Sequence, residues 1–234
     1  MTDATSDLRD DRVLLERTST AERVADILRT RIIEGYFRPG NRLSEETIVG
    51  DLEISRNTLR EAFRLLSHER LLRHELHRGV SVRKLSVADV IDLYRVRKAV
   101  ECATVRALVA GQPGIPAIEA AVVDGERAAD AGDWQQVGTA NLRYHQAVVA
   151  LADSPRLDEL MRGVLAELRL VFHVMSDTRR FYEPYLARNR QILGRIQAGD
   201  GEGADRLLAV YLDDAERQLV EAYTEESRKD AEPR

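Results

Sequence analysis

The sequence predicts a mainly α chain in two parts: three helices with a small β-hairpin, followed by an all-α bundle of about six helices. Two observations predict this class. Apolar residues recur every three or four positions along most of the chain, which is the period of amphipathic helices. Strict alternation of apolar and polar residues, the period of a strand, is clearest at residues 80–83. We expect a disordered arm at 1–16, a first domain at 17–84, a helical domain at 85–225 and a tail at 226–234.

Three helices are expected in the first domain, at residues 20–37, 44–51 and 56–70. The first has Thr20 as its cap and ends before Pro39-Gly40, since glycine and proline stop a helix. Ser44 and Ser55 stand at the starts of the other two, where a serine hydroxyl accepts a free backbone N–H. The third helix carries an apolar stripe and, on another face, three arginines four residues apart: Arg56, Arg60 and Arg64.

A short hairpin is expected after the third helix. Residues 71–75 can form one strand, 76–79 a turn and 80–83 a second strand. Three helices followed by such a hairpin are typical of a winged helix-turn-helix. In that motif the recognition helix, here the third helix at residues 56–70, presents its N-terminal residues to the major groove of DNA.

The second half of the chain shows helical periodicity interrupted by glycine and proline. Ser86 with Asp89, three residues later, is an N-terminal capping signal, and Ser154-Pro155 places a cap before a proline in the first helical position. Pro184 is expected in the first turn of its helix, where a missing N–H breaks no bond. The expected helices are 86–110, 117–131, 134–151, 155–176, 182–198 and a last one that reaches about residue 224.

Charge and cysteine content narrow the class of function. The formal net charge is −5, yet residues 56–84 hold eight basic and three acidic side chains. A local basic surface in an acidic protein is typical of a DNA-binding module, and a solvated helix face is the alternative explanation. Residues 1–16 lack the apolar segment of a secretory signal, no apolar run approaches a membrane span, and Cys102 is the only cysteine. We therefore expect a cytoplasmic protein.

Residues at the start of the third helix have the chemistry of base recognition. Arg56, Asn57 and Arg60 stand there. Arginine pairs with guanine and asparagine with adenine in the major groove, each pair contributing about 1–3 kcal/mol of discrimination. The free N–H groups of the same helix end also favour a phosphate. Spacing alone leaves open which residue contacts a base and which holds the backbone.

Several motifs together resemble the GntR family of bacterial regulators. They are Pro39-Gly40 with Leu43-Ser44-Glu45, the run Ser55-Arg56-x-x-x-Arg60-Glu61-Ala62, and the wing sequence His77-Arg78-Gly79. The second half is similar to the FCD effector domain of the FadR subfamily. The resemblance implies a homodimeric transcription regulator, most simply a repressor, with the Arg78-Gly79 tip in the minor groove. The residues it implies for operator DNA are Ser44, Ser55, Arg56, Asn57, Thr58, Arg60, Arg64, His77, Arg78 and Gly79.

The chain departs from the family pattern at two positions of the motif. The second helix has Glu46 where arginine is frequent, and the following turn has Glu53 where glycine is frequent. Both add negative charge close to where phosphates are expected. These departures bear on operator affinity more than on the fold.

The resemblance also implies an effector cavity in the helical domain, where many family members hold a divalent metal with one Asp and three His. The corresponding residues here are Asn141, His145, Asn189 and Tyr211, so one ligand of four remains. Amides and a phenol are poor ligands for first-row metals, and we expect no metal cofactor.

Arg97 stands where the family presents an arginine to the cavity, and an arginine fork suits a carboxylate. We therefore expect a small organic acid to bind Arg97, Asn141, His145, Asn189 and Tyr211. The alternative is that His145 and its neighbours form a satisfied polar core.

Two other classes of protein are weighed against a regulator. The sequence has no Gly-rich phosphate loop and no zincin or nucleophile-elbow motif, so we expect no enzyme. An effector-independent, nucleoid-associated protein is the alternative, and it would bind DNA through phosphates without sequence preference. His173, in an apolar stretch, and Cys102 are interpreted as packing residues.

Overall fold

A computed structural model describes residues 19–75, 79–108, 111–172 and 178–231, with side chains described as far as Glu225. The arm expected at 1–16, and His77, Arg78 and His173, lie outside the described residues. The chain divides into two compact units, residues 1–83 and 84–234. Each unit has a core of its own.

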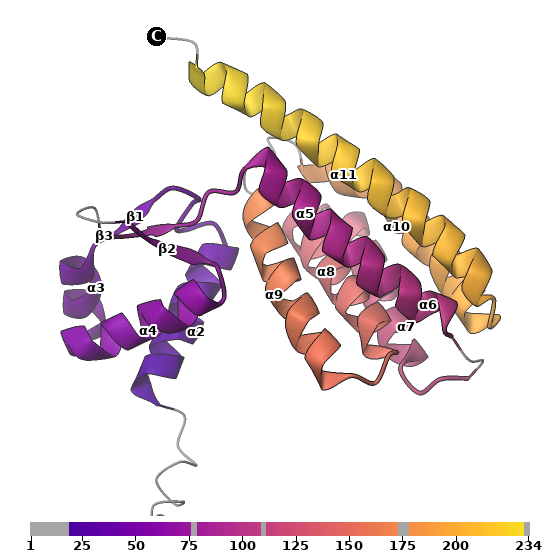
Figure 1. Cartoon of the computed structure of the whole chain (residues 1–234), viewed down its shortest axis with the longest axis horizontal. Helices are drawn as coiled ribbons and strands as arrows, with labels where there is room; N and C mark the ends of the chain where they lie inside the picture. Colours follow the sequence, from indigo (N-terminus) through magenta and orange to yellow (C-terminus); the bar gives the residue numbers. More distant parts are fainter. Residues whose placement is uncertain (1–18, 76–78, 109–110, 173–177, 232–234) are drawn as a thin grey trace, which may run out of the picture. The chain divides into compact units, whose positions relative to one another are not determined.

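The first unit contains the three expected helices: α2 (Thr20–Ile33), α3 (Glu45–Leu52) and α4 (Arg56–His68) (Figure 1). The cap of α2 differs from the expected Thr20. Ser19 accepts a hydrogen bond from the backbone N–H of Glu22, and the Glu22 carboxylate accepts one from the Ser19 N–H. This reciprocal capping box satisfies two N–H groups at once. The helix ends at Ile33, four residues before the expected end, and Gly35 follows with a positive φ of 81°.

Apolar stripes on the three helices and the sheet form the core of the first unit. An ion pair closes one edge, where Arg29 of α2 donates to both carboxylate oxygens of Glu69, at 2.6 and 2.7 Å. Burial of these side chains is the main stabilising term in such a small domain. The larger buried side chains of the helices are Val24, Leu28 and Ile32 from α2, Ile48 from α3, and Leu59, Phe63 and Leu66 from α4.

The wing is a sheet of three strands rather than a hairpin of two. Strands β2 (Leu72–Glu75) and β3 (Gly79–Val82) pair antiparallel as expected, and β1 (Arg42–Leu43) pairs with the other edge of β3. The sequence did not predict β1, because two residues carry no measurable alternation. Its register brings Arg42 opposite Ser81.

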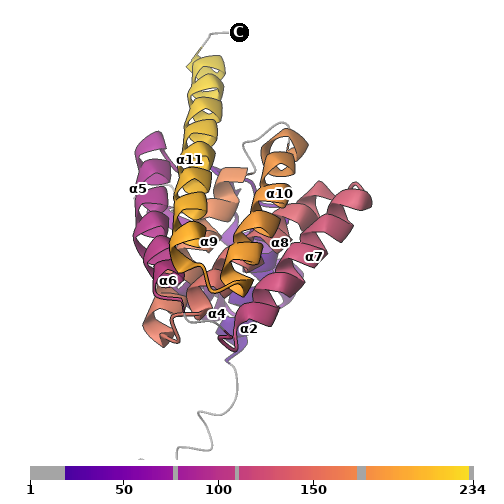
Figure 2. The same cartoon turned by 90° about the vertical axis from the view of Figure 1, so that its right-hand side faces the viewer.

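All secondary-structure elements in the described residues of the second unit are helical (Figure 2). α7 and α8 lie side by side, and α11 packs against α5 and α10. Within the described ranges, no helix is both long and apolar enough to cross a membrane. The elements are α5 (Val87–Arg97), a π-helical turn η2 (Lys98–Cys102), α6 (Ala103–Arg106), α7 (Ile115–Asp130), α8 (Trp134–Ala150), α9 (Pro155–Phe172), α10 (Thr178–Gln197) and α11 (Gly201–Ala231).

Three expectations for this unit were wrong in detail. The first helix is not a continuous α-helix over 86–110, because η2 interrupts it and the helix ends at Arg106. Pro184 lies inside α10, not in its first turn. Proline cannot donate to the carbonyl four residues earlier, and Gln218 of α11 donates to that Arg180 carbonyl instead, at 3.4 Å. The last helix continues past residue 224 to Ala231.

Candidate functional site

The start of α4 is held by local capping. Ser55 accepts from the Thr58 N–H at 3.0 Å, and the two hydroxyls lie 2.8 Å apart. Ser44 does the same for α3, accepting from the Thr47 N–H at 3.2 Å. The hydroxyls of Ser44, Ser55 and Thr58, which the resemblance places at DNA, are thus already bonded within their own helix ends. They set the position of the exposed side chains beside them.

The exposed side chains at the start of α4 differ in whether they have a partner within the described residues. Arg56 and Asn57 are exposed and have no hydrogen-bond or ion-pair partner in the described part of the chain. Arg60 is 63% exposed and lies 3.5 Å from a carboxylate oxygen of Glu45 in α3, measured from its Nε. A surface pair of this kind is weak, so Arg60 remains available to an incoming phosphate or base.

The turn before α4 carries a strained residue. Glu53 adopts left-handed backbone angles, with φ of 51° and ψ of 43°, at the C-cap of α3. Glycine takes this conformation without the Cβ clash that a glutamate meets. The structure therefore explains why a glycine would suit this position, and it leaves the Glu53 and Glu46 carboxylates at the surface.

An arginine that sequence reasoning missed lies at the wing. The guanidinium of Arg42, on β1, comes within 3.5 Å of where a Cβ would project from Gly79, the first residue of β3. Gly79 itself has a φ of +82°. Arg42 is exposed and no partner for it exists in the described residues. No signal in the sequence could reveal this contact, because it depends on the unpredicted pairing of β1 with β3.

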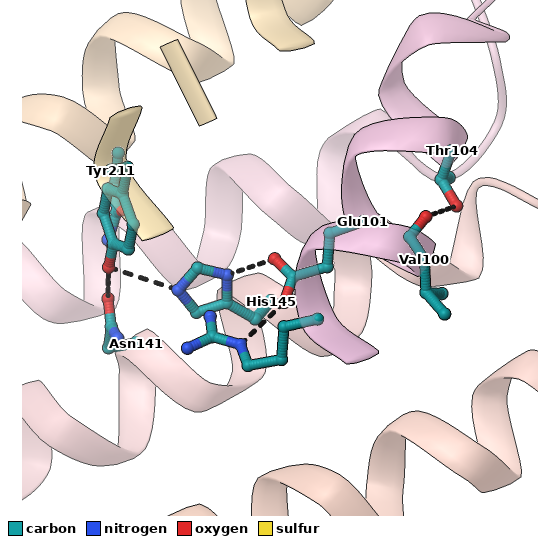
Figure 3. Close-up of polar contacts among 8 residues, drawn as sticks. Val100, Glu101, Thr104, Asn141, His145 and Tyr211 are labelled. Carbon is teal, nitrogen blue, oxygen red and sulfur yellow. Dashed lines mark hydrogen bonds and ion pairs between the residues drawn. The ribbon is translucent and has the colours of Figure 1, made fainter. Parts of the chain in front are cut away.

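The five residues expected to bind an effector meet inside the second unit; Figure 3 labels Asn141, His145 and Tyr211 among them. Arg97 donates to Glu101 at 2.8 Å, and the other Glu101 oxygen lies 2.7 Å from His145 Nδ1. His145 Nε2 lies 3.2 Å from the Tyr211 hydroxyl. The chain continues through Asn141 Oδ1, which is 3.0 Å from the Tyr211 hydroxyl and accepts from Asn189 at 2.9 Å.

Glu101 was not predicted, and it completes a buried polar cluster with Arg97, Asn141, His145, Asn189 and Tyr211. It lies in the π-helical turn, which places its side chain toward His145 (Figure 3). One signal could have found it: an acid four residues after Arg97, within an apolar stretch, is in position for an i,i+4 ion pair. Arg97, Glu101 and His145 are each no more than 1% exposed.

Charges in this cluster balance internally. Burial by itself would raise the pKa of Glu101, but Arg97 and His145 more than offset it and the pKa lies below its ordinary value. Burial and the positive charge of Arg97 lower the pKa of His145, despite the opposing effect of Glu101. The ring is therefore neutral at pH 7, and its N–H faces Glu101, since an ionised carboxylate only accepts. A single buried ion pair remains.

The donor set does not suit a metal ion. One imidazole, two amides and a phenol occupy the four positions, and both imidazole nitrogens are engaged by Glu101 and Tyr211. Among the described residues there is no group of three His, Cys, Asp or Glu side chains that could hold a metal. First-row metals bind imidazole, thiolate and carboxylate ligands instead.

Space beside the cluster is small. A cavity of about 10 Å³ is lined by Asn141, Asn189, Tyr182 and small or apolar side chains of α7, α8 and α10. That volume holds about one water molecule. Arg97 is stacked on Tyr94, with its guanidinium carbon 4.9 Å from the ring centre. One guanidinium nitrogen of Arg97, Nη2, has no hydrogen-bond partner. Binding of an effector by Arg97 stays a prediction.

Comparison with known proteins gives two matches, one within each of the two units of the chain. Residues 20–82 match the gntR family of bacterial regulatory proteins, and residues 92–214 match the FCD domain. A crystal structure of a GntR transcriptional regulator from Rhodococcus sp. RHA1 has 48% sequence identity and a TM-score of 0.85, covering 88% of this chain and 100% of its own.

Curated relatives are more distant but cover most of both chains. The HTH-type transcriptional regulator YdhC of Bacillus subtilis is 26% identical over 195 residues, which is 81% of this chain and 86% of the relative. A protein of Paenarthrobacter nicotinovorans, described as a probable D-xylose utilization operon transcriptional repressor, is 26% identical over 200 residues, covering 85% and 88%.

Proposed function

Because this chain belongs to the GntR family of bacterial regulatory proteins and carries an FCD domain, we propose that it binds operator DNA as a homodimeric repressor. It is a DNA-binding transcription regulator with an N-terminal winged helix-turn-helix and a helical effector-binding domain. The finer parts of the proposal are the dimer, the repression, and control by a small carboxylate without a metal. Regulation rather than catalysis is the role we assign to it.

One observation carries the DNA-binding half of the proposal. The capped start of α4 presents Arg56 and Asn57 without partners in the described residues, and Arg60 one turn later in a weak pair. A recognition helix contacts base edges with its N-terminal residues. Arginine and asparagine supply the two bidentate pairs that discriminate guanine and adenine.

Dimerisation and repression are supported by general reasoning and by relatives. One recognition helix contacts few base pairs, and helix-turn-helix proteins bind paired half-sites as symmetric dimers. The Paenarthrobacter relative is described as a repressor. The donor set at Asn141, His145, Asn189 and Tyr211 supports control that needs no metal.

A paired substitution tests the DNA interface. Operator fragments would be selected from random duplexes by the wild type and then titrated with the Arg56→Ala/Arg60→Ala variant. Loss of two base contacts, at about 1–3 kcal/mol each, corresponds to at least ~30-fold weaker binding. The matched control is Arg95→Ala/Arg162→Ala, which removes the same charge from exposed positions of the helical unit. Equal retention of both variants on the selected fragment would contradict the proposal.

A second candidate function is favoured by the small cavity. A regulator without an effector, or a nucleoid-associated protein, needs no ligand space, and the cavity beside the cluster has room for about one water. Footprinting at several salt concentrations separates a regulator from a nucleoid-associated protein. A regulator protects a discrete two-fold site, whereas a packing protein shows only salt-dependent phosphate binding.

A further inference from the structure

Two arginines in the described part of the helical unit are buried, and they differ in their partners. Arg97 is 1% exposed and faces the Glu101 carboxylate at 2.8 Å. Arg169, on α9, is 7% exposed. Buried charges in proteins are normally paired with an opposite charge, because an isolated ion loses its hydration.

Arg169 has no carboxylate partner among the described residues. Its Nη2 donates to the Thr139 hydroxyl of α8 at 2.9 Å, and that hydroxyl donates to the Gln135 carbonyl at 3.1 Å. Burial lowers the pKa of Arg169, and the phenol of Tyr182 is the neighbour that opposes this shift. Within the described residues, the buried cation is therefore oriented by a neutral hydroxyl and faces no carboxylate.

The Arg169 guanidinium has donors that the described residues do not use. A guanidinium has five N–H donors, and the described residues use one of them, at Thr139. Arg169 keeps 7% of its surface exposed, and none of its nitrogens is among the described buried atoms that lack a hydrogen-bond partner. A flat fork of N–H groups matches the two oxygens of a carboxylate.

Two aromatic side chains are candidates to contact the apolar part of a ligand: Tyr182, a neighbour of Arg169 in space, and Phe172. Phe172 follows Arg169 by one turn of α9, and its ring centre is 5.2 Å from that of Tyr182 on α10. Both rings are at least nine-tenths buried. Tyr182 also lines the small cavity at Asn141 and Asn189. Its ring fits there because Gly138 has no side chain: a Cβ at that position would be 2.7 Å from the Tyr182 hydroxyl.

We propose that Arg169 anchors a binding site for a small organic carboxylate, oriented by Thr139, with the apolar part of the ligand against Phe172 and Tyr182. The site deepens the proposed function and rests on it. It moves the anchor of the effector from Arg97, which Glu101 already neutralises, to the buried arginine that faces no carboxylate among the described residues. Tyr182 connects this anchor to the polar cluster, since it is a neighbour of both Arg169 and the small cavity.

Thermal unfolding of the full chain tests the site with sodium benzoate and sodium acetate as probes, each against sodium chloride at equal ionic strength. Benzoate is expected to raise the melting midpoint of the wild type in a saturable way, and acetate to raise it less, because acetate lacks a ring. Arg169→Gln is expected to lose this rise. The matched control Arg162→Gln, on an exposed position of the same helix, is expected to keep it.

A second variant keeps the proposal falsifiable if Arg169→Gln does not fold. Thr139→Val retains the arginine but removes the group that orients it, and the benzoate concentration for half of the shift is expected to rise several-fold. Equal midpoints of the wild type in benzoate and chloride would overturn the proposal. An equal benzoate shift in the wild type and in Arg169→Gln would overturn it as well.

Operator binding distinguishes this proposal from the proposed function. If carboxylates release the wild type and Arg169→Gln from the selected operator equally, the regulator stands and the Arg169 site is refuted. If benzoate stabilises only proteins that retain Arg169, but no carboxylate changes operator binding, the site stands and effector control is refuted.

Discussion

Replacing Glu101 by glutamine tests how much the buried ion pair between Arg97 and Glu101 contributes to the free energy of unfolding. The substitution keeps the shape and one acceptor oxygen but removes the charge opposite Arg97, whose Nε is 2.8 Å away. Arginine does not lose its proton in proteins, so the guanidinium would stay charged at 1% exposure. Breaking one side of a buried pair costs about 3–5 kcal/mol. That is a large share of the roughly 5–15 kcal/mol that stabilises a typical domain.

The reverse substitution, Arg97→Met, is expected to behave differently with pH. It leaves Glu101 buried without its main counter-charge, and the pKa of that carboxyl would rise above its unfolded value because burial is no longer offset. With this raised pKa in the folded state, the Glu101 carboxyl is protonated and uncharged at low pH, and burial of the uncharged form costs less. The penalty of this variant should therefore shrink as pH falls toward the acid range.

A double-mutant cycle completes the argument. Arg97→Met/Glu101→Gln removes both charges of this ion pair, and apolar or neutral replacements of buried pairs are often close to neutral in stability. The double variant should therefore recover most of the loss of either single variant. Urea denaturation followed by circular dichroism measures each free energy of unfolding. Asp92→Asn is the control, since it breaks an exposed pair with Arg95 and should have no measurable effect. A Glu101→Gln variant within about 1 kcal/mol of the wild type would refute the reasoning.

Single features of the two units give four further predictions. Glu53→Gly should stabilise the first unit by about 1 kcal/mol in urea denaturation, because it relieves left-handed backbone strain. Gly138→Ala should destabilise the second unit by about 1–3 kcal/mol, since its Cβ would meet the Tyr182 hydroxyl at 2.7 Å; no change would argue against the tight fit. Acidification below about pH 6.5 should reduce stability in melting experiments, because the folded state lowers the pKa of His145 and the unfolded chain then binds more protons, and His145→Gln should flatten this dependence. Equimolar Zn²⁺ should leave the melting midpoint unchanged; a large rise would contradict the metal-free proposal.

Local signals in the sequence were sufficient for most helix starts. Ser44, Ser55 and Ser86 cap helices in the structure as expected, because a capping serine interacts with residues only three positions away. Ser19 was missed although its partner Glu22 is equally close, so the signal existed and the prediction of Thr20 was wrong. The two-residue strand β1 had no such signal, because its pairing with β3 involves residues far apart in the chain.

The members of the buried cluster could be predicted from the sequence only in part. The family resemblance named Asn141, His145, Asn189 and Tyr211, and the structure joins them in one hydrogen-bonded chain. It could not indicate that Glu101 would reach His145. That contact is made from the π-helical turn at Lys98–Cys102, and such turns within helices are rare.

The amino-acid sequence alone determined the class of this protein, a regulator with an N-terminal winged helix-turn-helix and a helical C-terminal domain. These depend on periodicity, capping and motif spacing, which act over a few residues. Only the tertiary structure decided which buried charges are balanced. Arg97 and Arg169 look alike in the sequence, but Glu101 faces one and a threonine hydroxyl faces the other. The free energy of a buried charge depends on the groups that folding brings around it, and those come from helices distant in the chain.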